Sequence, residues 1–307
     1  MPSTSDIAVL APRAIRESPL PRRWKKRGQF VDLAGLDDAG MLARVFGVED
    51  ATLPAAPLHY LGMSGRKPAG YCMFAYPVHL HPRRDQLILM AGPDFEPRED
   101  ESERLIADLE AQFEAFRIER TSDGMWFLLL DQDPKLETTP LDEVLGENIN
   151  DHLPRGGDAM DWHKIMNELQ MVLFVSEVNQ RREAAGEPTL NSLWFWGGGH
   201  VPEIPPSRWA RLVSNDPVAL GMGRRAELEV LSADSRPEAV ELAVPGTLWV
   251  HAGEAREDQG RVPSQRQWKA LRDALQKAEI GSLLLMEPGY GELRIEARGS
   301  GSWWPWR

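Results

Sequence analysis

Residues 190–200 constrain the fold of this chain more than any other segment. The run Leu-Asn-Ser-Leu-Trp-Phe-Trp leads directly into Gly197-Gly198-Gly199-His200, and three prolines follow within six residues. Those prolines exclude a helix after the glycines. Alternate residues of a strand point to one face, and glycine lets other groups approach the backbone closely. The segment therefore predicts a strand that ends in a bare backbone loop, which is either a binding site or a tightly packed corner.

The composition is that of an ordinary globular protein, with 42% hydrophobic and 27% charged residues. Cys72 is the single cysteine, so neither an intramolecular disulfide nor a multi-cysteine metal site can form. No apolar run approaches the roughly 18 residues of a membrane span, and the first residues lack a signal-peptide pattern. We therefore expect a cytoplasmic protein with no membrane partner.

Charge is distributed unevenly along the chain. Residues 1–30 carry a net charge of +5, with a basic cluster at 22–27, whereas the remaining residues carry −17. The first thirty residues also hold four prolines and few large apolar side chains, which predicts an extended or partly disordered arm. An acidic body disfavours nucleic acid, so no such partner is expected. We interpret the basic cluster as solvated rather than as an RNA or lipid contact.

Apolar periodicity predicts the secondary structure. Helical spacing covers residues 37–48, 101–116, 159–185 and 264–278, and a short helix is predicted from Ser207 to about Ser214. Strand patterns cover 70–79, 86–90, 125–130, 247–251, 282–286 and 292–297. The loop-rich segment 131–157 predicts a border, which gives an arm over 1–30, an α/β subdomain over 31–150 and an α/β subdomain over 151–307 with an aromatic tail. The predicted fold class is α/β, with mixed sheets flanked by helices.

Amide side chains stand among apolar residues on the long predicted helix, and a buried amide needs hydrogen-bond partners. Beside the glycine strand, such a helix would form a pocket. The candidate ligand-binding residues are Asn167, Gln170, Asn179, Asn191, Trp194, Trp196, Gly197, Gly198, Gly199 and His200. The alternative is that the amides bind loop backbone and the glycines only pack.

Known nucleotide-binding loops do not fit the glycine triplet. The dinucleotide fingerprint requires a glycine where Pro202 stands and a helix start after it, and no P-loop motif occurs. His79 and His81 share one side of a predicted strand, but a metal centre needs a third ligand, for which Asp85 is a weak candidate. A second loose group contains His251, Glu254, Glu257 and Asp258. We therefore predict no catalytic residue, no metal ligand and no cofactor.

Three segments match one known family when they are taken together. They are Tyr76–Leu80, then Leu153–Gly156 with Asn167–Met171, and Asn191–Gly199. They resemble the proteobacterial RpfE-type regulatory proteins, which are often labelled phosphoglycerate-mutase-like. The Trp-Gly-x-Gly run, the proline loop and a later Gly-x-Gly at Gly221 and Gly223 are similar to archaeal-type cofactor-independent phosphoglycerate mutases.

The mutase resemblance implies a degenerate alkaline-phosphatase-like arrangement. In that superfamily, Asp and His clusters hold two metal ions and a serine is the nucleophile. In those enzymes an Asp-Gly segment near the N-terminus and a later Asp-Glu-x-Gly-His segment carry metal ligands. The first thirty residues here have no Asp-Gly strand, and no histidine follows Glu254, Glu257 and Asp258. Because two-metal chemistry needs nearly all of its ligands, mutase activity is not expected.

The predicted function is therefore a non-catalytic regulatory or ligand-binding protein whose ligand is a small phosphorylated or acidic metabolite. The alternative is a metal-dependent phosphoryl-transfer enzyme with a degenerate metal site. A third hypothesis is a homo-oligomer that assembles through the tryptophan-rich tail Trp303–Trp306.

Overall fold

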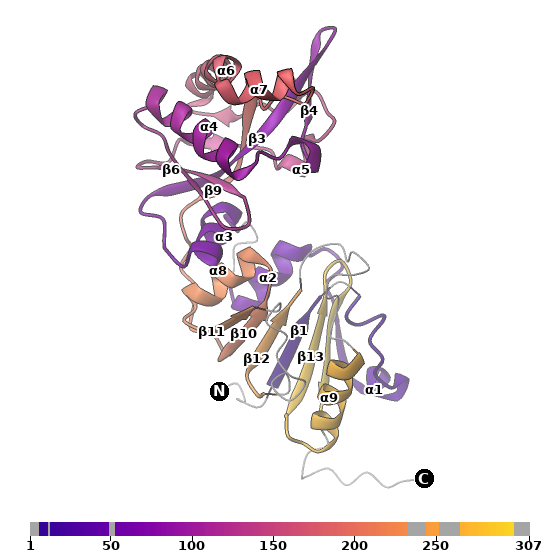
Figure 1. Ribbon diagram of the computed structural model, residues 1–307. Coiled ribbons are helices and arrows are strands. Elements are labelled where there is room, and N and C mark those ends of the chain that lie inside the picture. Colours follow the sequence, from indigo (N-terminus) through magenta and orange to yellow (C-terminus); the bar gives the residue numbers. More distant parts are fainter. Residues whose placement is uncertain (1–5, 12, 49–52, 233–243, 252–264, 298–307) are drawn as a thin grey trace. The chain divides into compact units, whose positions relative to one another are not determined.

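The chain folds into two compact units in the computed structural model (Figure 1). Unit 1 contains Met1–Leu53 and Pro202–Arg307, and unit 2 contains Pro54–Val201. The structure describes residues 6–11, 13–48, 53–232, 244–251 and 265–297. The predicted tail at Trp303–Trp306 lies outside these residues.

These units differ from the predicted parts. Unit 2 is an insertion into unit 1, so the predicted border near residue 150 falls inside one compact unit. The proline- and glycine-rich segment before that border forms short elements within unit 2, and turn residues serve such connections as well as they serve linkers. The predicted arm over 1–30 is also wrong in part, because Ile7, Ala8 and Val9 are fully buried in a strand.

Unit 1 is built on a seven-stranded mixed sheet with the strand order β11-β10-β12-β1-β13-β14-β2. The first five of these strands run parallel, and the last two are antiparallel to their neighbours. The strands are β1 (Asp6–Leu10), β2 (Gln29–Asp32), β10 (Arg211–Ser214), β11 (Glu229–Ser232), β12 (Thr247–Val250), β13 (Ser282–Glu287) and β14 (Gly291–Glu296).

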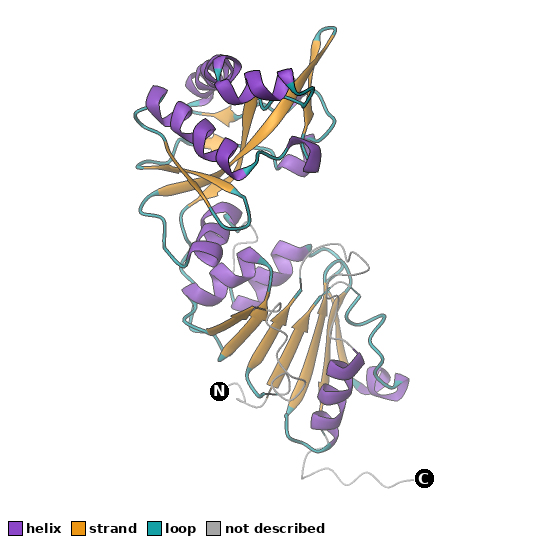
Figure 2. Ribbon diagram, viewed as in Figure 1, coloured by secondary structure: helices purple, strands orange, loops and turns teal. Residues whose placement is uncertain are grey.

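Helices cover both faces of this sheet (Figure 2). Ile7 and Val9 of β1 face a core that includes Trp268 and Leu271 from one helix and Trp24 from another. Leu212 points to the opposite face, where it packs against Gly223. A central parallel strand covered on both faces has no polar side, which explains why β1 is apolar throughout its buried centre. The helices are α1 (Arg22–Arg27), α2 (Asp38–Phe46), α8 (Pro217–Arg225) and α9 (Gln265–Gln276).

Unit 2 is built around one long strand, β3 (Tyr71–Arg83), which pairs antiparallel with three others. The strands that complete this sheet are β4 (Gln86–Met90), β5 (Arg117–Arg120), β6 (Trp126–Leu130) and β9 (Ser192–Gly199), and a separate small pair is β7 (Leu136–Glu137) and β8 (Arg155–Gly156). The helices are α3 (Ala55–Ser64), α4 (Glu99–Gln112), α5 (Leu141–Val144), α6 (Ala159–Val175) and α7 (Glu177–Ala184), with 3-10 turns at Pro93–Phe95 and Ile149–Asp151.

The long helix predicted over 159–185 is two helices, α6 and α7. Ser176 separates them in an extended conformation, and its hydroxyl accepts a hydrogen bond from the amide of Val178. The same hydroxyl donates to Asp108 at 2.9 Å. Serine favours this capping role over a helix interior, which explains the break.

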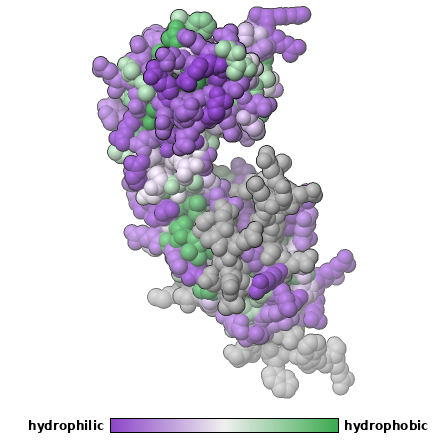
Figure 3. All heavy atoms as spheres, viewed as in Figure 1, coloured by the Kyte–Doolittle hydropathy of each residue, from purple (hydrophilic) through white to green (hydrophobic). Residues whose placement is uncertain are grey.

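The outer face of α6 is apolar and exposed. Met171, Phe174 and Val175 are 66%, 75% and 62% exposed. In Figure 3, hydrophobic residues interrupt an otherwise hydrophilic surface around this helix. None of the helices in the described part of the chain has the length and hydrophobicity that crossing a membrane requires.

Candidate functional site

Close packing explains the three glycines at the end of β9. A Cβ atom at Gly197, whose φ is +65°, would lie 3.0 Å from the ring of Phe74. At Gly198 it would overlap the Tyr71 side chain, and at Gly199 it would lie 2.6 Å from Cβ of Pro54. Three neighbouring side chains therefore occupy the space that side chains at these positions would need.

The two tryptophans of β9 also belong to the core of unit 2. Trp194 is buried, and its indole Nε1 donates to the Thr139 carbonyl at 2.9 Å. Trp196 is half-buried with its ring centroid 4.7 Å from that of Phe74. His200 is exposed and meets the ring of Tyr71 edge-on.

The predicted amides have separate roles. Asn179 is buried and bonds to the backbone of Leu173 and Leu190, which fixes the chain that enters β9. Asn191 bonds to both backbone groups of Leu80 and so extends the strand pairing.

Asn167 is exposed, Gln170 is half-buried, and neither side chain makes a hydrogen bond within the described residues. The two pockets described below include none of the ten predicted residues. Their role in ligand binding stays a prediction.

Sequence patterns did not reveal a histidine–aspartate pair in unit 2. His59 Nε2 lies 2.6 Å from Asp123 Oδ2, and Thr121 donates to the other oxygen of the same carboxylate. Burial alone would raise the pKa of Asp123, but these two hydrogen bonds and the histidine charge outweigh it and lower the pKa to about 2. The residues are 64 positions apart, and only the fold brings them together. The pair ties α3 to the turn between β5 and β6.

Unit 1 offers the edge at which open α/β sheets usually bind ligands, the carboxyl ends of its parallel strands. His251 follows β12, with its backbone amide bonded to Leu10 of β1 and its ring stacked on Trp249. Burial lowers the pKa of this imidazole. Its Nε2 has no partner within the described residues. Ser214 ends β10 and donates to the carbonyl of Val250, and Asp216 caps α8 through the amide of Ala219.

Glu287 closes the same edge at the end of β13. Its side chain is 0% exposed, and it accepts hydrogen bonds from the amides of Ile15 and Arg16 at 2.9 and 3.0 Å and from Arg16 Nε. Lys25 donates to the carbonyl of Ile15 at 2.9 Å, and its pKa is lowered because burial outweighs the attraction of Glu287. This carboxylate therefore holds the turn that follows β1.

Whether the carboxyl edge of the sheet could hold a metal ion depends on the His, Cys, Asp and Glu side chains that lie there. Among the described residues, no three His, Cys, Asp or Glu side chains form a group that could hold a metal ion. The carboxylates of Glu287 and Asp216 bind backbone amides instead. His79 of the predicted histidine pair bonds to the carbonyl of Thr189. The described donors do not fit two metal ions; Glu254, Glu257 and Asp258 lie outside the described residues.

A pocket of about 430 Å³ lies in unit 1, lined by residues of α2, of the loop before β10, and by Met286 and Glu292 of β13 and β14. Met286, which lines it, pairs with Leu10 at the end of β1. Two guanidinium groups also line it, those of Arg44 from α2 and Arg208 from the segment before β10. Arg44 lies 3.5 Å from Glu292, and Arg208 has no ion pair among the described residues. We call this cavity the Arg44–Arg208 pocket.

Comparison with known proteins identifies similar enzymes. No family model matches the chain. A 2,3-bisphosphoglycerate-independent phosphoglycerate mutase of Methanosarcina acetivorans is 28% identical over 142 residues, which is 43% of this chain and 36% of the relative. One of Methanothrix thermoacetophila is 40% identical over 67 residues, 22% of this chain and 17% of the relative. The matched segments thus cover well under half of each curated relative.

Solved structures show the same fold over nearly the whole chain. The cofactor-independent phosphoglycerate mutase of Thermoplasma acidophilum has a TM-score of 0.50 at 16% identity, covering 96% of this chain and 89% of its own. The PH0037 protein of Pyrococcus horikoshii has a TM-score of 0.54 at 13% identity, with 95% and 87% covered. The predicted α/β class is confirmed, and the fold is phosphoglycerate-mutase-like. The finer resemblance to RpfE-type proteins stays a prediction.

Proposed function

We propose that the protein binds a small phosphorylated acid in the Arg44–Arg208 pocket, on a phosphoglycerate-mutase-like fold and without two-metal chemistry. The observation that carries this proposal is the pair of arginines, Arg44 and Arg208, that line one cavity of unit 1. A regulatory role, as in the RpfE-type resemblance, would follow from ligand binding without turnover.

The electrostatics of the pocket support an anionic ligand. Glu292, which also lines the pocket, lies 3.5 Å from Arg44, longer than a well-formed charge-assisted hydrogen bond. Arg208 forms no ion pair within the described residues, although the charges of Glu292 and Asp6 act on it. Guanidinium groups bind carboxylate and phosphate oxygens through paired N–H donors. A phosphorylated acid offers both groups, one for each arginine.

A second candidate is a metal-dependent phosphoryl-transfer enzyme. The comparisons alone favour it over a non-catalytic protein, since the curated relatives are mutases. We rank this candidate second because phosphoryl transfer in this fold class would need a group of metal-ligating side chains. The described residues contain no such group. We derive no catalytic step for it.

Isothermal titration with 3-phosphoglycerate tests the first candidate. We expect saturable binding that Arg44→Gln or Arg208→Gln weakens by about tenfold or more, since each removes a charge-assisted contact. Arg266→Gln, an exposed arginine on α9, is the matched control and should bind normally. Glycerate, which lacks the phosphate, should bind more weakly.

A mutase assay with Mn²⁺ separates the two candidates. Turnover with stoichiometric bound metal, lost in His251→Asn, would establish the enzyme and reject the non-catalytic proposal. Absence of saturable binding by the wild-type protein would reject the Arg44–Arg208 pocket as the site.

A further inference from the structure

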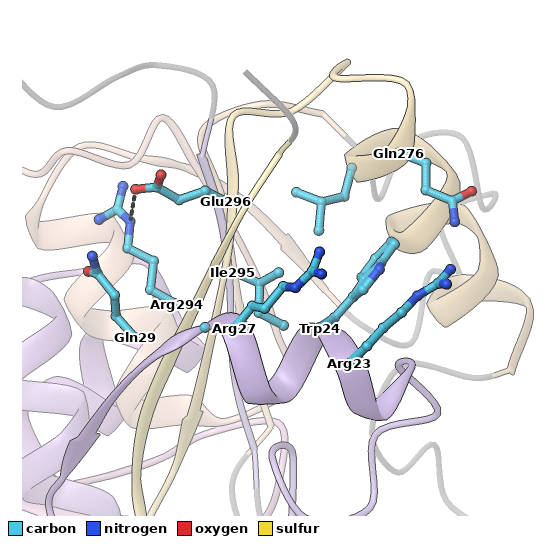
Figure 4. A pocket seen from close by; sticks show the side chains of 10 residues that line it. Arg23, Trp24, Arg27, Gln29, Gln276, Arg294, Ile295 and Glu296 are labelled. Carbon is cyan, nitrogen blue, oxygen red and sulfur yellow. Dashed lines mark ion pairs between the residues drawn. The ribbon is translucent and has the colours of Figure 1, made fainter. Parts of the chain in front are cut away.

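Unit 1 contains a second, larger cavity of about 520 Å³ between α1, α9 and β14 (Figure 4). Its volume lies within the range of small-molecule sites. Trp24 and Arg27 of α1 rise toward α9, Arg23 lies beside Gln276, and Arg294 and Glu296 form the far side. We call it the α1–α9 pocket. Gly28 brings α1 against β14, because a Cβ atom there would lie 2.6 Å from Leu293 and 2.8 Å from the carbonyl of Arg294.

The cations of the α1–α9 pocket are only partly neutralised. Arg294 pairs with Asp6 at 2.9 Å and with Glu296 at 4.0 Å. The side chains of Arg23 and Arg27, in contrast, are exposed and have no ion pair or hydrogen bond within the described part of the chain. They stand four residues apart on one helical face, where like charges repel. The chain as a whole carries a net charge of −12, so an anion is attracted to this cavity by the two local guanidinium groups and not by the overall charge.

The remaining walls suit a flat apolar group with polar edges. Trp24 is half-buried against the core, and Leu275 and Ile295 are 3% and 5% exposed. An indole next to aliphatic side chains offers a stacking surface for an aromatic ring. The exposed amides of Gln29 and Gln276 add hydrogen-bond donors and acceptors for the edge of such a ring.

We propose that the α1–α9 pocket binds a nucleoside phosphate, with the base on Trp24 and the phosphate on Arg23 and Arg27. This site is separate from the Arg44–Arg208 pocket, with which it shares no lining residue. It also gives a role to the basic cluster at 22–27. The backbone loops of Rossmann and P-loop proteins are not needed here, because side chains supply the phosphate contacts.

The concave shape decides between small and large anions. RNA or a lipid surface would contact exposed cations on every side of α1, including Arg22 and Lys26. Arg23 and Arg27 are exposed as well, but they line the cavity and Arg22 and Lys26 do not, so a small ligand there would contact only the first pair.

Fluorescence anisotropy with N-methylanthraniloyl-ADP tests the proposal on the full chain. We expect saturable binding that unlabelled ADP reverses. Arg23→Gln with Arg27→Gln should weaken it by about 10- to 100-fold, the range for lost hydrogen bonds to a charged group. Trp24→Leu should weaken it while circular dichroism shows a folded protein. Arg22→Gln with Lys26→Gln is the matched control, because it removes the same charge from α1 outside the pocket, and it should bind normally.

Two outcomes would overturn the proposal. One is no saturable binding at millimolar ADP by the wild-type protein. The other is an equal loss in both double variants, which would indicate non-specific charge; RNA or anionic vesicles competing equally with ADP would point the same way. Arg44→Gln should leave ADP binding unchanged, so this test fails or succeeds independently of the phosphorylated-acid site.

Discussion

Replacing Glu287 should destabilise unit 1 more than any surface change. The carboxylate is fully buried, and Glu287→Ala leaves the amides of Ile15 and Arg16 without an acceptor. Each buried donor left unpaired costs about 1 to 3 kcal/mol. The Arg16 side chain is 56% exposed, so the loss of its ion pair adds little. We expect Glu287→Ala to lower the free energy of unfolding by about 4 kcal/mol.

Glu287→Gln isolates the contribution of the carboxylate, because it keeps the size of the side chain and removes its charge. The amides of Ile15 and Arg16 both bond to Oε2, so the glutamine oxygen can keep both bonds, weakened by the loss of the charge. The acceptor that faces Arg16 Nε is lost, and the expected cost is about 2 kcal/mol. Urea unfolding followed by tryptophan fluorescence gives the difference, with linear extrapolation to water. Hydrogen exchange at Ile15 and Arg16 should accelerate in both variants.

Glu279→Gln is the control for the urea experiment. Glu279 is exposed and pairs loosely with Lys277 at 3.7 Å, so its loss should stay within about 0.5 kcal/mol. If Glu287→Gln costs no more than this control and leaves exchange at residues 15 and 16 unchanged, the reasoning about the turn after β1 is wrong.

Two further predictions concern unit 2. Asp123→Asn should lower the free energy of unfolding at pH 7 by about 1 to 2 kcal/mol, allowing for partial exposure, because the folded pKa is held below the unfolded value. This stabilisation is fully present above about pH 4 and is lost as the pH falls toward 2, so urea midpoints of wild type and variant should converge over that window; a constant gap would contradict it. Gly198→Ala should cost about 1 to 3 kcal/mol in the same assay, because the new methyl group overlaps buried Tyr71. Gly157→Ala, with no atom closer than 4.0 Å, is its control, and equal losses would exclude packing as the reason for the glycine.

Local patterns predicted several elements well because their periodicity is regular. The strand predicted over 86–90 is β4 (Gln86–Met90), and the helix predicted over 264–278 contains α9 (Gln265–Gln276). The segment from Ser207 to Ser214 was predicted as a helix, but it ends in the parallel strand β10. A four-residue strand buried on both faces lacks the alternation that marks exposed strands, so it resembles a short helix in sequence.

The pockets lay beyond sequence reasoning for a different reason. The α1–α9 pocket joins side chains from both ends of the chain, and Glu287 meets an amide 271 residues away. Such contacts depend on strand order, which local periodicity does not contain. The glycine strand, in contrast, stands out in the sequence, but the sequence alone does not distinguish close backbone packing from a ligand-binding loop.

The insertion of unit 2 sets the order of events during synthesis. All of unit 2 is contiguous, whereas β1 must wait about 240 more residues for its neighbour β12 and about 277 for its neighbour β13. At ribosomal rates this delay is on the order of 10 to 50 s. We therefore expect unit 2 to fold co-translationally while the apolar β1 stays unpaired and available to chaperones.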